Sequence, residues 1–336
     1  MTTTHATELI ILRELLAARG DWVSGAYLAR RLGISRVAVW AHMNRLRREG
    51  FKFEAVRSRG YRLLGRPSRL SQALLHALLR IKLPDGAITV LDETDSTNSE
   101  AERRIAAGQA APFAVFAAAQ TNGRGRFGRV WHSPDEGNLY ASFAFQPRVD
   151  PMRMQLFTLW MGVNLCEVLE SFFKITPAIK WPNDLLVSGR KVGGMLTEAR
   201  IDADRIRDLI FGLGINVNAD TTNWPRDIAR TAATLAGVTG AQVDINQLAA
   251  AIAGRVFGAF NTFIGGGFEP QLATLWARYD ALRDAQVGVN HAGQVTRGIA
   301  SGIDADGSLI VAADSGRKVR FRAGEVTLEK GVRAGA

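Results

Sequence analysis

Positive charge is concentrated in the first fifth of the chain, and this unevenness constrains the architecture most. Residues 1–70 contain 14 Lys and Arg residues against 5 Asp and Glu residues, although the whole 336-residue chain carries a formal net charge of only +10. Phosphate neutralisation supplies most non-specific nucleic-acid affinity, so a basic module of this size indicates nucleic-acid binding. We therefore expect a basic N-terminal domain followed by a larger, nearly neutral part.

Hydrophobic spacing in the basic segment predicts a winged helix-turn-helix. A helix over residues 7–19 precedes a short helix capped by Ser24, and a turn leads to a second helix, capped by Ser35, over residues 36–49. Residues 51–64 alternate around a basic tip, which predicts a β-hairpin wing. The residues expected to face DNA are Arg36, Asn44, Arg45, Arg48, Arg57 and Arg59.

The remainder of the chain mixes strands and helices without strict alternation. Short turns join several expected strands between residues 87 and 217, and two long helices are expected over residues 152–173 and 245–263. This pattern predicts an α+β fold with a mixed sheet. From residue 286 onwards, short strands predict a small β-barrel. The expected domains are residues 1–65, 66–282 and 283–336.

Composition excludes several classes of protein. The single cysteine, Cys166, rules out a disulfide framework and a zinc site built on cysteines. No apolar stretch reaches the roughly 20 residues of a membrane helix, and the N-terminus lacks the pattern of a secretory signal. We therefore expect a cytoplasmic protein without membrane contact.

Residues 120–131, Gln-Thr-Asn-Gly-Arg-Gly-Arg-Phe-Gly-Arg-Val-Trp, form the densest motif. Its glycines match the dinucleotide pattern G-x-G-x-x-G, but a turn rather than a helix follows, and no Gly-Lys-Ser/Thr closes a phosphate loop of the Walker type. We reject both interpretations. A mobile loop whose backbone N–H groups and arginines fold over phosphates and a carboxylate fits better, and a solvated basic loop is the alternative. The arginines are Arg124, Arg126 and Arg129.

Three weaker motifs accompany this loop. Residues 180–185, Lys-Trp-Pro-Asn-Asp-Leu, present a cation, an indole and a carboxylate at a strand end, and Lys191 follows across a hairpin, within reach of a carboxylate and an α-phosphate. Ser96, Thr97 and Asn98 suit a neutral, hydrogen-bonding ligand head. Glycines within residues 212–218 permit close approach of a ligand to the backbone.

Together, these motifs resemble the biotin–protein ligase family over nearly the whole chain, including its bifunctional members that also repress the biotin operon. The resemblance implies a catalytic domain flanked by a winged helix and an SH3-like barrel. It implies that biotin and ATP, with Mg²⁺, form biotinyl-5′-AMP, from which biotin is transferred to a lysine of a biotin carboxyl carrier protein. It also implies a homodimer that binds operator DNA when the adenylate is bound.

Site assignments follow from the resemblance and the motifs. The biotin contacts are Ser96, Thr97, Asn98, Gln120, Arg124, Gly125, Arg126 and Lys191. The adenylate contacts are Arg124, Arg126, Arg129, Trp131, Lys180, Asn183 and Asn216. The catalytic residues are Lys191, Arg126 and Asp184, and no protein ligand to a metal is expected. One departure is Phe127, where relatives often carry another arginine.

Three alternatives stay open at this point. The N-terminal module of a ligase need not regulate transcription, and Trp40 on the reading helix is bulky. A lipoate ligase has a similar catalytic fold, although the arginine motif and Trp181 disfavour it. A non-enzymatic transcription factor that senses a small ligand leaves the arginines and Lys191 without a purpose.

Overall fold

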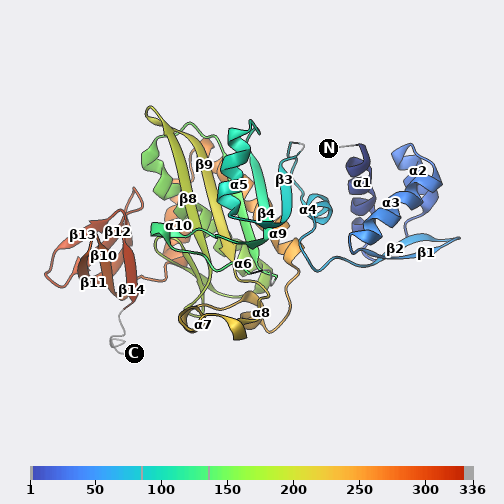
Figure 1. Ribbon diagram of the computed structural model, residues 1–336. Coiled ribbons are helices and arrows are strands. Elements are labelled where there is room, and N and C mark those ends of the chain that lie inside the picture. The colour runs from blue at the N-terminus through green and yellow to red at the C-terminus, as the bar shows by residue number, and fades with distance from the viewer. Residues whose placement is uncertain (1–2, 85, 135–136, 329–336) are drawn as a thin grey trace.

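The computed structural model describes residues 3–84, 86–134 and 137–328. These residues form three parts (Figure 1). The N-terminal part is mainly helical, the central part surrounds a seven-stranded sheet, and a five-stranded sheet forms the C-terminal part. The N-terminal part and the C-terminal sheet lie on opposite sides of the central part (Figure 1). The predicted α+β fold class is confirmed.

The N-terminal part is the expected winged helix-turn-helix. Its elements are α1 (Thr3–Ala17), α2 (Gly25–Leu32), α3 (Arg36–Arg48), β1 (Lys52–Val56) and β2 (Gly60–Gly65). Val39, Met43 and Leu46 of α3 are fully buried, because their spacing places them on one helical face. Ser35 accepts a hydrogen bond from the Ala38 backbone N–H at 3.1 Å and so caps α3. Ser24 is at the N-cap position of α2, as predicted, but its side chain makes no capping hydrogen bond.

The central sheet has the strand order β3-β4-β5-β9-β8-β7-β6, and only β3 and β4 are parallel neighbours. Its strands are β3 (Ile88–Thr94), β4 (Phe113–Gln120), β5 (Leu139–Phe145), β6 (Pro177–Lys180), β7 (Asp184–Val187), β8 (Arg190–Asp202) and β9 (Arg205–Ile215). Alternate side chains point to opposite faces. Phe143 and Phe145 therefore join the main core, whereas Val115 and Ala144 pack with α5 on the other face.

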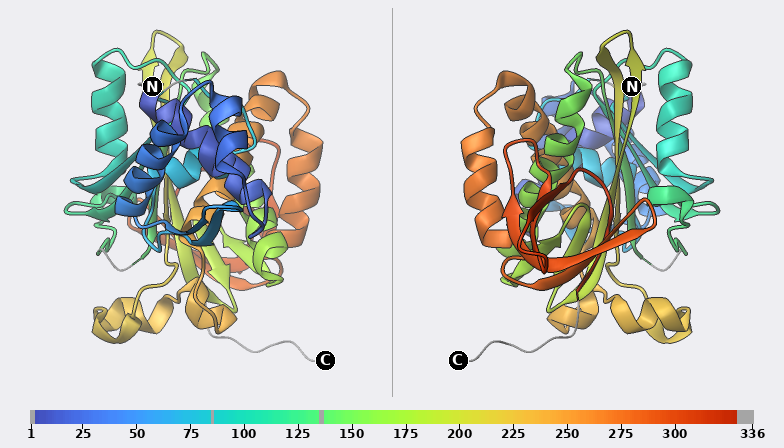
Figure 2. Two further views of the ribbon diagram at one scale, coloured as in Figure 1. Left: turned by 90° about the vertical axis from the view of Figure 1, so that its right-hand side faces the viewer. Right: turned by 90° about the vertical axis from the view of Figure 1, so that its left-hand side faces the viewer.

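Helices cover both faces of this sheet, with α5 on one side and α9 on the other (Figure 2). The helices are α4 (Gln72–Leu78), α5 (Thr97–Ala106), α6 (Met154–Phe173), α7 (Arg226–Thr231), α8 (Leu235–Thr239), α9 (Ile245–Gly265) and α10 (Glu269–Tyr279). Short 3-10 turns are η1 (Arg126–Gly128), η2 (Pro151–Arg153) and η3 (Thr221–Asn223). Cys166 is buried on α6, as expected for a packed thiol, and burial raises the pKa of that thiol.

Two helical segments are long and apolar enough to cross a membrane on length and composition alone: Pro151–Phe173 and Ile245–Gly265. The expectation that no segment of this chain meets that criterion was therefore wrong. Both segments contribute to the main core, where α6 packs against α9. Length and composition do not separate such buried core helices from membrane spans.

The C-terminal sheet is wholly antiparallel, with the order β13-β12-β11-β10-β14. Its strands are β10 (Gln286–His291), β11 (Gln294–Ile303), β12 (Leu309–Ala313), β13 (Lys318–Phe321) and β14 (Glu325–Leu328). The strands expected of a small barrel are present, and the hydrogen-bonded order ends at β13 and β14. Buried residues such as Val287 and Val326 join the main core, so this sheet is attached to the central part.

Helix α4 connects two cores. Leu74 packs in the N-terminal core, whereas its neighbour Leu75 packs in the main core. The chain entering α4 is held by Asn246 of α9, which is fully buried. Its Nδ2 donates to the carbonyls of Pro67 and Arg69, and its Oδ1 accepts from the Ser71 N–H. The segment that follows the expected domain boundary at residue 65 is therefore a fixed connection.

Candidate functional site

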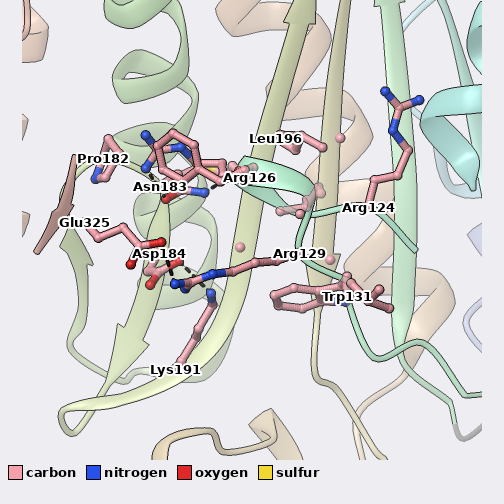
Figure 3. Close-up of a pocket in the computed structure, with 18 of the residues that line it drawn as sticks. Arg124, Arg126, Arg129, Trp131, Pro182, Asn183, Asp184, Lys191, Leu196 and Glu325 are labelled. Atoms are coloured by element: carbon pink, nitrogen blue, oxygen red, sulfur yellow. Dashed lines mark hydrogen bonds and ion pairs between the residues drawn. The ribbon is translucent and has the colours of Figure 1, made fainter. Parts of the chain in front are cut away.

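A cavity of ≈ 450 Å³ lies between the β7–β8 hairpin, the loop of residues 123–131 and the start of β14 (Figure 3). We call residues 123–131 the arginine loop. Segments far apart in the sequence meet here, because β8 and β9 run through the middle of the sheet and the C-terminal sheet covers one end. The cavity brings together most of the predicted ligand contacts: Ser96, Thr97, Asn98, Gln120, Arg124, Gly125, Arg126, Arg129, Trp131, Lys180, Asn183, Asp184 and Lys191.

Cationic side chains gather on one side of this cavity. Lys191 Nζ lies 2.7 Å from Asp184 Oδ1 and 5.1 Å from the ring centre of Trp131. Lys180 is half-buried, and burial lowers the pKa of its ammonium although the charge of Asp184 opposes the shift. The carboxylates that line the cavity are Asp184 and Glu325, and the cationic side chains outnumber them, which leaves net positive potential for an anionic ligand.

Two arginines of the arginine loop contact the C-terminal sheet. Arg126 donates to Asn183 Oδ1 at 3.4 Å and to the Gly324 carbonyl at 3.5 Å. Arg129 forms an ion pair with Glu325 at 2.5 Å. Burial lowers the pKa of the Arg126 guanidinium. These contacts hold the loop across the cavity.

The third arginine points elsewhere. Figure 3 shows the Arg124 guanidinium turned away from Asp184 and Lys191. It forms an ion pair with Glu198 of β8 and donates to Ser99 Oγ at 3.1 Å. Arg126 and Arg129 therefore lie on the same side of the cavity as the two lysines, and Arg124 lies at its outer side.

A buried polar network forms the opposite wall. Thr97 donates its backbone N–H to Gln120 Oε1 at 2.8 Å, and Gln120 Nε2 donates to Ser133 Oγ at 2.9 Å. Asn98 contacts Ser142 Oγ on one side and Glu198 on the other. The predicted contacts for a neutral ligand head therefore lie together, but both polar atoms of the Asn98 side chain already have protein partners.

Glycines form the floor of the cavity, where the protein's own side chains lie close to their backbone; the predicted approach of a ligand stays a prediction. A Cβ on Gly214 would lie 2.5 Å from the Trp131 indole, and one on Gly194 would lie 2.9 Å from it. A Cβ on Gly212 would overlap the Asn98 amide. Within the described part of the chain, the buried Nε1 of Trp131 has no hydrogen-bond partner.

Two residues singled out by motif lie apart from the polar centre of the cavity. Asn216 is buried and donates to the Ala233 carbonyl at 3.2 Å, and it is not among the residues that line the cavity. Trp181 is 1% exposed and donates to the Gly307 carbonyl at 3.0 Å, so its indole serves packing against the C-terminal sheet. Trp181 itself lines the cavity, whereas Asn216 lies two residues after Gly214, which lines it.

Sequence reasoning missed three polar residues of this site. Ser142 interrupts the otherwise apolar strand β5, which is a signal that was available. Glu198 lies in β8 beyond the recognised hairpin, and Glu325 comes from the far end of the chain. No local pattern connects these two glutamates with the arginine loop.

Only some of the residues predicted to contact DNA are exposed. Four are exposed: Arg36, Arg48, Arg57 and Arg59. Arg45 is partly buried and donates to Glu8 at 3.3 Å, and Asn44 accepts a hydrogen bond from Arg47 at 2.7 Å. The structure thus leaves the wing tip and both ends of α3 most accessible.

Comparisons with known proteins agree with this geometry. The Biotin/lipoate A/B protein ligase family matches residues 90–216, an HTH domain matches residues 7–62, and the Biotin protein ligase C terminal domain matches residues 286–328. The bifunctional ligase/repressor BirA of Bacillus subtilis is 32% identical over 96% of this chain and 98% of its own length. The Escherichia coli protein of that name is 31% identical over 93% of this chain and 95% of its own length.

A solved structure extends the agreement. The biotin protein ligase from Aquifex aeolicus in complex with biotin and ATP superposes with a TM-score of 0.62 at 28% identity, covering 73% of this chain and all of that one. The fold and the cavity define a protein ligase of the biotin/lipoate class. The chain belongs to the biotin protein ligase family and carries the helix-turn-helix domain of its bifunctional ligase/repressor members. The predicted family and enzyme class are confirmed, and a non-enzymatic transcription factor is excluded.

Proposed function

We propose that the cavity joins biotin to AMP, with ATP as the nucleotide substrate, and that biotin then passes to a lysine of a biotin carboxyl carrier protein. One observation carries this proposal: four of the cationic side chains that line the cavity gather on one side of it, and a neutral polar network forms the other wall. The cationic residues are Arg126, Arg129, Lys180 and Lys191. An anion and a neutral head group therefore have separate, adjacent places.

The first step brings two anions together, since the biotin carboxylate attacks the α-phosphorus and pyrophosphate leaves with the bonding electrons. Lys191 and Arg126 offset the repulsion and hold the attacking oxygen in line. Among the described residues, no three Asp, Glu, His or Cys side chains converge as a metal site. Mg²⁺ that arrives with the nucleotide would be held largely by phosphate oxygens and would neutralise their charge, while Asp184 stays paired with Lys191.

In the second step, the lysine amine attacks the acyl carbonyl and AMP leaves. The arginine loop keeps water from the mixed anhydride, because Arg126 and Arg129 hold it across the cavity. Asp184 accepts a proton from, or hydrogen-bonds to, the attacking amine. The variant Asp184→Asn tests this role: transfer from preformed adenylate is expected to slow by about 10²-fold. Transfer at the wild-type rate would remove Asp184 from the mechanism.

Pyrophosphate exchange tests the proposed activity. Purified protein is incubated with ATP, Mg²⁺ and labelled pyrophosphate in three samples, containing biotin, lipoate or no acid. We expect label to enter ATP only with biotin. Equal exchange with lipoate would indicate a lipoate ligase, and no exchange in any sample would overturn the proposal.

A second function is favoured by the exposed basic wing and reading helix. We propose that the adenylate-bound protein forms a homodimer, whose two winged helices bind a two-fold operator and repress transcription. ATP, carrier protein and DNA all fit a cytoplasmic location. Duplexes selected from a random pool are titrated with protein, with and without biotin plus ATP, while sedimentation follows dimerisation. If affinity is the same in both conditions, the N-terminal module does not respond to biotin.

A further inference from the structure

A chain of hydrogen-bonded polar side chains runs from half-buried Glu198 on β8 to buried Thr97 at the start of α5. Glu198 Oε2 accepts a hydrogen bond from Asn98 Nδ2 at 2.6 Å. Asn98 Oδ1 lies 2.5 Å from Ser142 Oγ, which lies 2.7 Å from Thr97 Oγ1. Thr97, Asn98 and Ser142 are at most 4% exposed, so these contacts are shielded from water.

The carboxylate at one end sets the direction of every hydrogen bond in this chain. The Glu198 carboxylate pairs with Arg124 and can only accept hydrogen bonds. Asn98 therefore turns its NH₂ group towards Glu198 and its carbonyl oxygen towards Ser142. The single hydroxyl proton of Ser142 goes to that oxygen, which cannot donate, so Ser142 Oγ is left to accept from Thr97.

Thr97 is the end of the chain that borders the cavity. Its hydroxyl proton points into the protein, either to Ser142 Oγ at 2.7 Å or to Gln120 Oε1 at 3.2 Å. Its remaining lone pair is the group left to meet a ligand. Gln120 Oε1 is also an acceptor, so the wall offers oxygen acceptors side by side.

We infer that Glu198 is a positioning residue that fixes Thr97 as a hydrogen-bond acceptor, which selects a ligand head carrying an N–H group, such as the cyclic urea of biotin. The inference rests on the proposed function for the identity of that ligand. Without the carboxylate, the Asn98 amide can rotate, Ser142 can donate to Thr97, and Thr97 can present its own proton to the ligand. A ligand N–H then meets a donor instead of an acceptor.

The variant Glu198→Gln tests this inference in the full-length protein, because glutamine keeps the shape but can also donate. We expect the calorimetric Kd for biotin to rise about tenfold, the effect of one lost hydrogen bond. The KM for ATP should change by less than about twofold. Glu102→Gln is the matched control, because Glu102 also approaches the Arg124 guanidinium, at 3.7 Å, whereas the Asn98 amide is hydrogen-bonded to Glu198 and Ser142. An unchanged Kd for Glu198→Gln, or an equal rise in the control, would overturn the inference.

A ligand analogue supplies a readout that a merely structural role would not move. In a cyclic carbamate analogue of biotin, ring oxygen replaces one urea N–H. The informative analogue is the one in which oxygen replaces the urea N–H that faces Thr97. The wild-type protein should bind this analogue about tenfold more weakly than biotin. The Glu198→Gln variant should lose most of this preference for biotin. If that variant does not fold, Ser142→Ala interrupts the same chain and takes its place. If pyrophosphate exchange depends on biotin but Glu198→Gln keeps the wild-type preference for biotin over the analogue, this inference alone is refuted. If exchange does not depend on biotin, the proposed function is refuted.

Discussion

At the scale of single residues, burial alters the titration of a lysine beside the cavity. The pKa of Lys180 lies below its usual value near 10.5, because desolvation outweighs the attraction of Asp184. A lysine with a lowered pKa loses its positive charge at a lower pH than a free lysine does. If this charge binds nucleotide phosphate, binding weakens as the pH rises through the lowered value.

We therefore predict that kcat/KM for ATP falls on the alkaline side at a pH below 10.5. The variant Lys180→Arg should shift this fall to higher pH, because a guanidinium stays charged. Pyrophosphate exchange measured between about pH 7 and 10.5 checks the prediction. Identical alkaline profiles for the two proteins would show that another group is responsible.

At the scale of elements, the glycines of the arginine loop serve different purposes. A Cβ on Gly123 would overlap Ser133 Oγ and lie 2.6 Å from the Trp131 carbonyl, so the base of the loop has no room for a side chain. Gly128 has φ +72° and open space around its Cβ position. We predict that Gly123→Ala lowers adenylate formation by at least about tenfold, whereas Gly128→Ala costs only about 1 kcal/mol of local strain.

Single-turnover adenylate formation, measured with circular dichroism as a check on folding, compares the two loop variants. Comparable losses in both would mean that loop conformation in general, and not space at the base, limits the reaction. Gly123→Ala with full activity would contradict the steric argument.

Helices and strands were predictable from the sequence where apolar residues recur at a regular spacing that marks the buried face. The apolar spacing of α3, α6 and α9 and the short turns of the antiparallel strands gave their approximate limits. Helix α5 was missed because Ser96, Thr97 and Asn98 resemble a turn, although they begin a helix whose polar side chains are buried. The roles of Glu198 and Glu325 depend on contacts between distant segments, which no local period encodes.

At the scale of the whole molecule, the basic wing should make DNA binding depend on salt. Arg57 and Arg59 are exposed at its tip, and Arg59 also lies 5.8 Å from the Trp22 ring centre. We predict that replacing both arginines by alanine weakens DNA binding and makes the slope of log K against log salt concentration shallower by about 2. Fluorescence anisotropy at several salt concentrations measures this slope. The control replaces exposed Arg317 and Lys318 of the C-terminal sheet, and an equal change there would show a general charge effect.

The connection between the DNA-binding part and the ligase part should depend on Asn246. Asn246→Ala leaves the carbonyls of Pro67 and Arg69 and the N–H of Ser71 without this partner, which should cost about 2–4 kcal/mol locally. We predict faster trypsin cleavage between residues 66 and 71 with little loss of pyrophosphate exchange. Gln247→Ala, an exposed neighbour, is the control. Equal cleavage rates in all three proteins would contradict this role.

The division of helix α4 between two cores determines where a hybrid protein can be joined. In a chimera joined at residue 65, Leu74 would come from the recipient ligase and the DNA-binding domain from another protein. Leu74 would then pack against a core that it does not match. A splice after residue 79 would move the mismatch to Leu75 and the ligase core. Exchanging the specificity of such a repressor therefore requires both neighbours of α4 to be redesigned together.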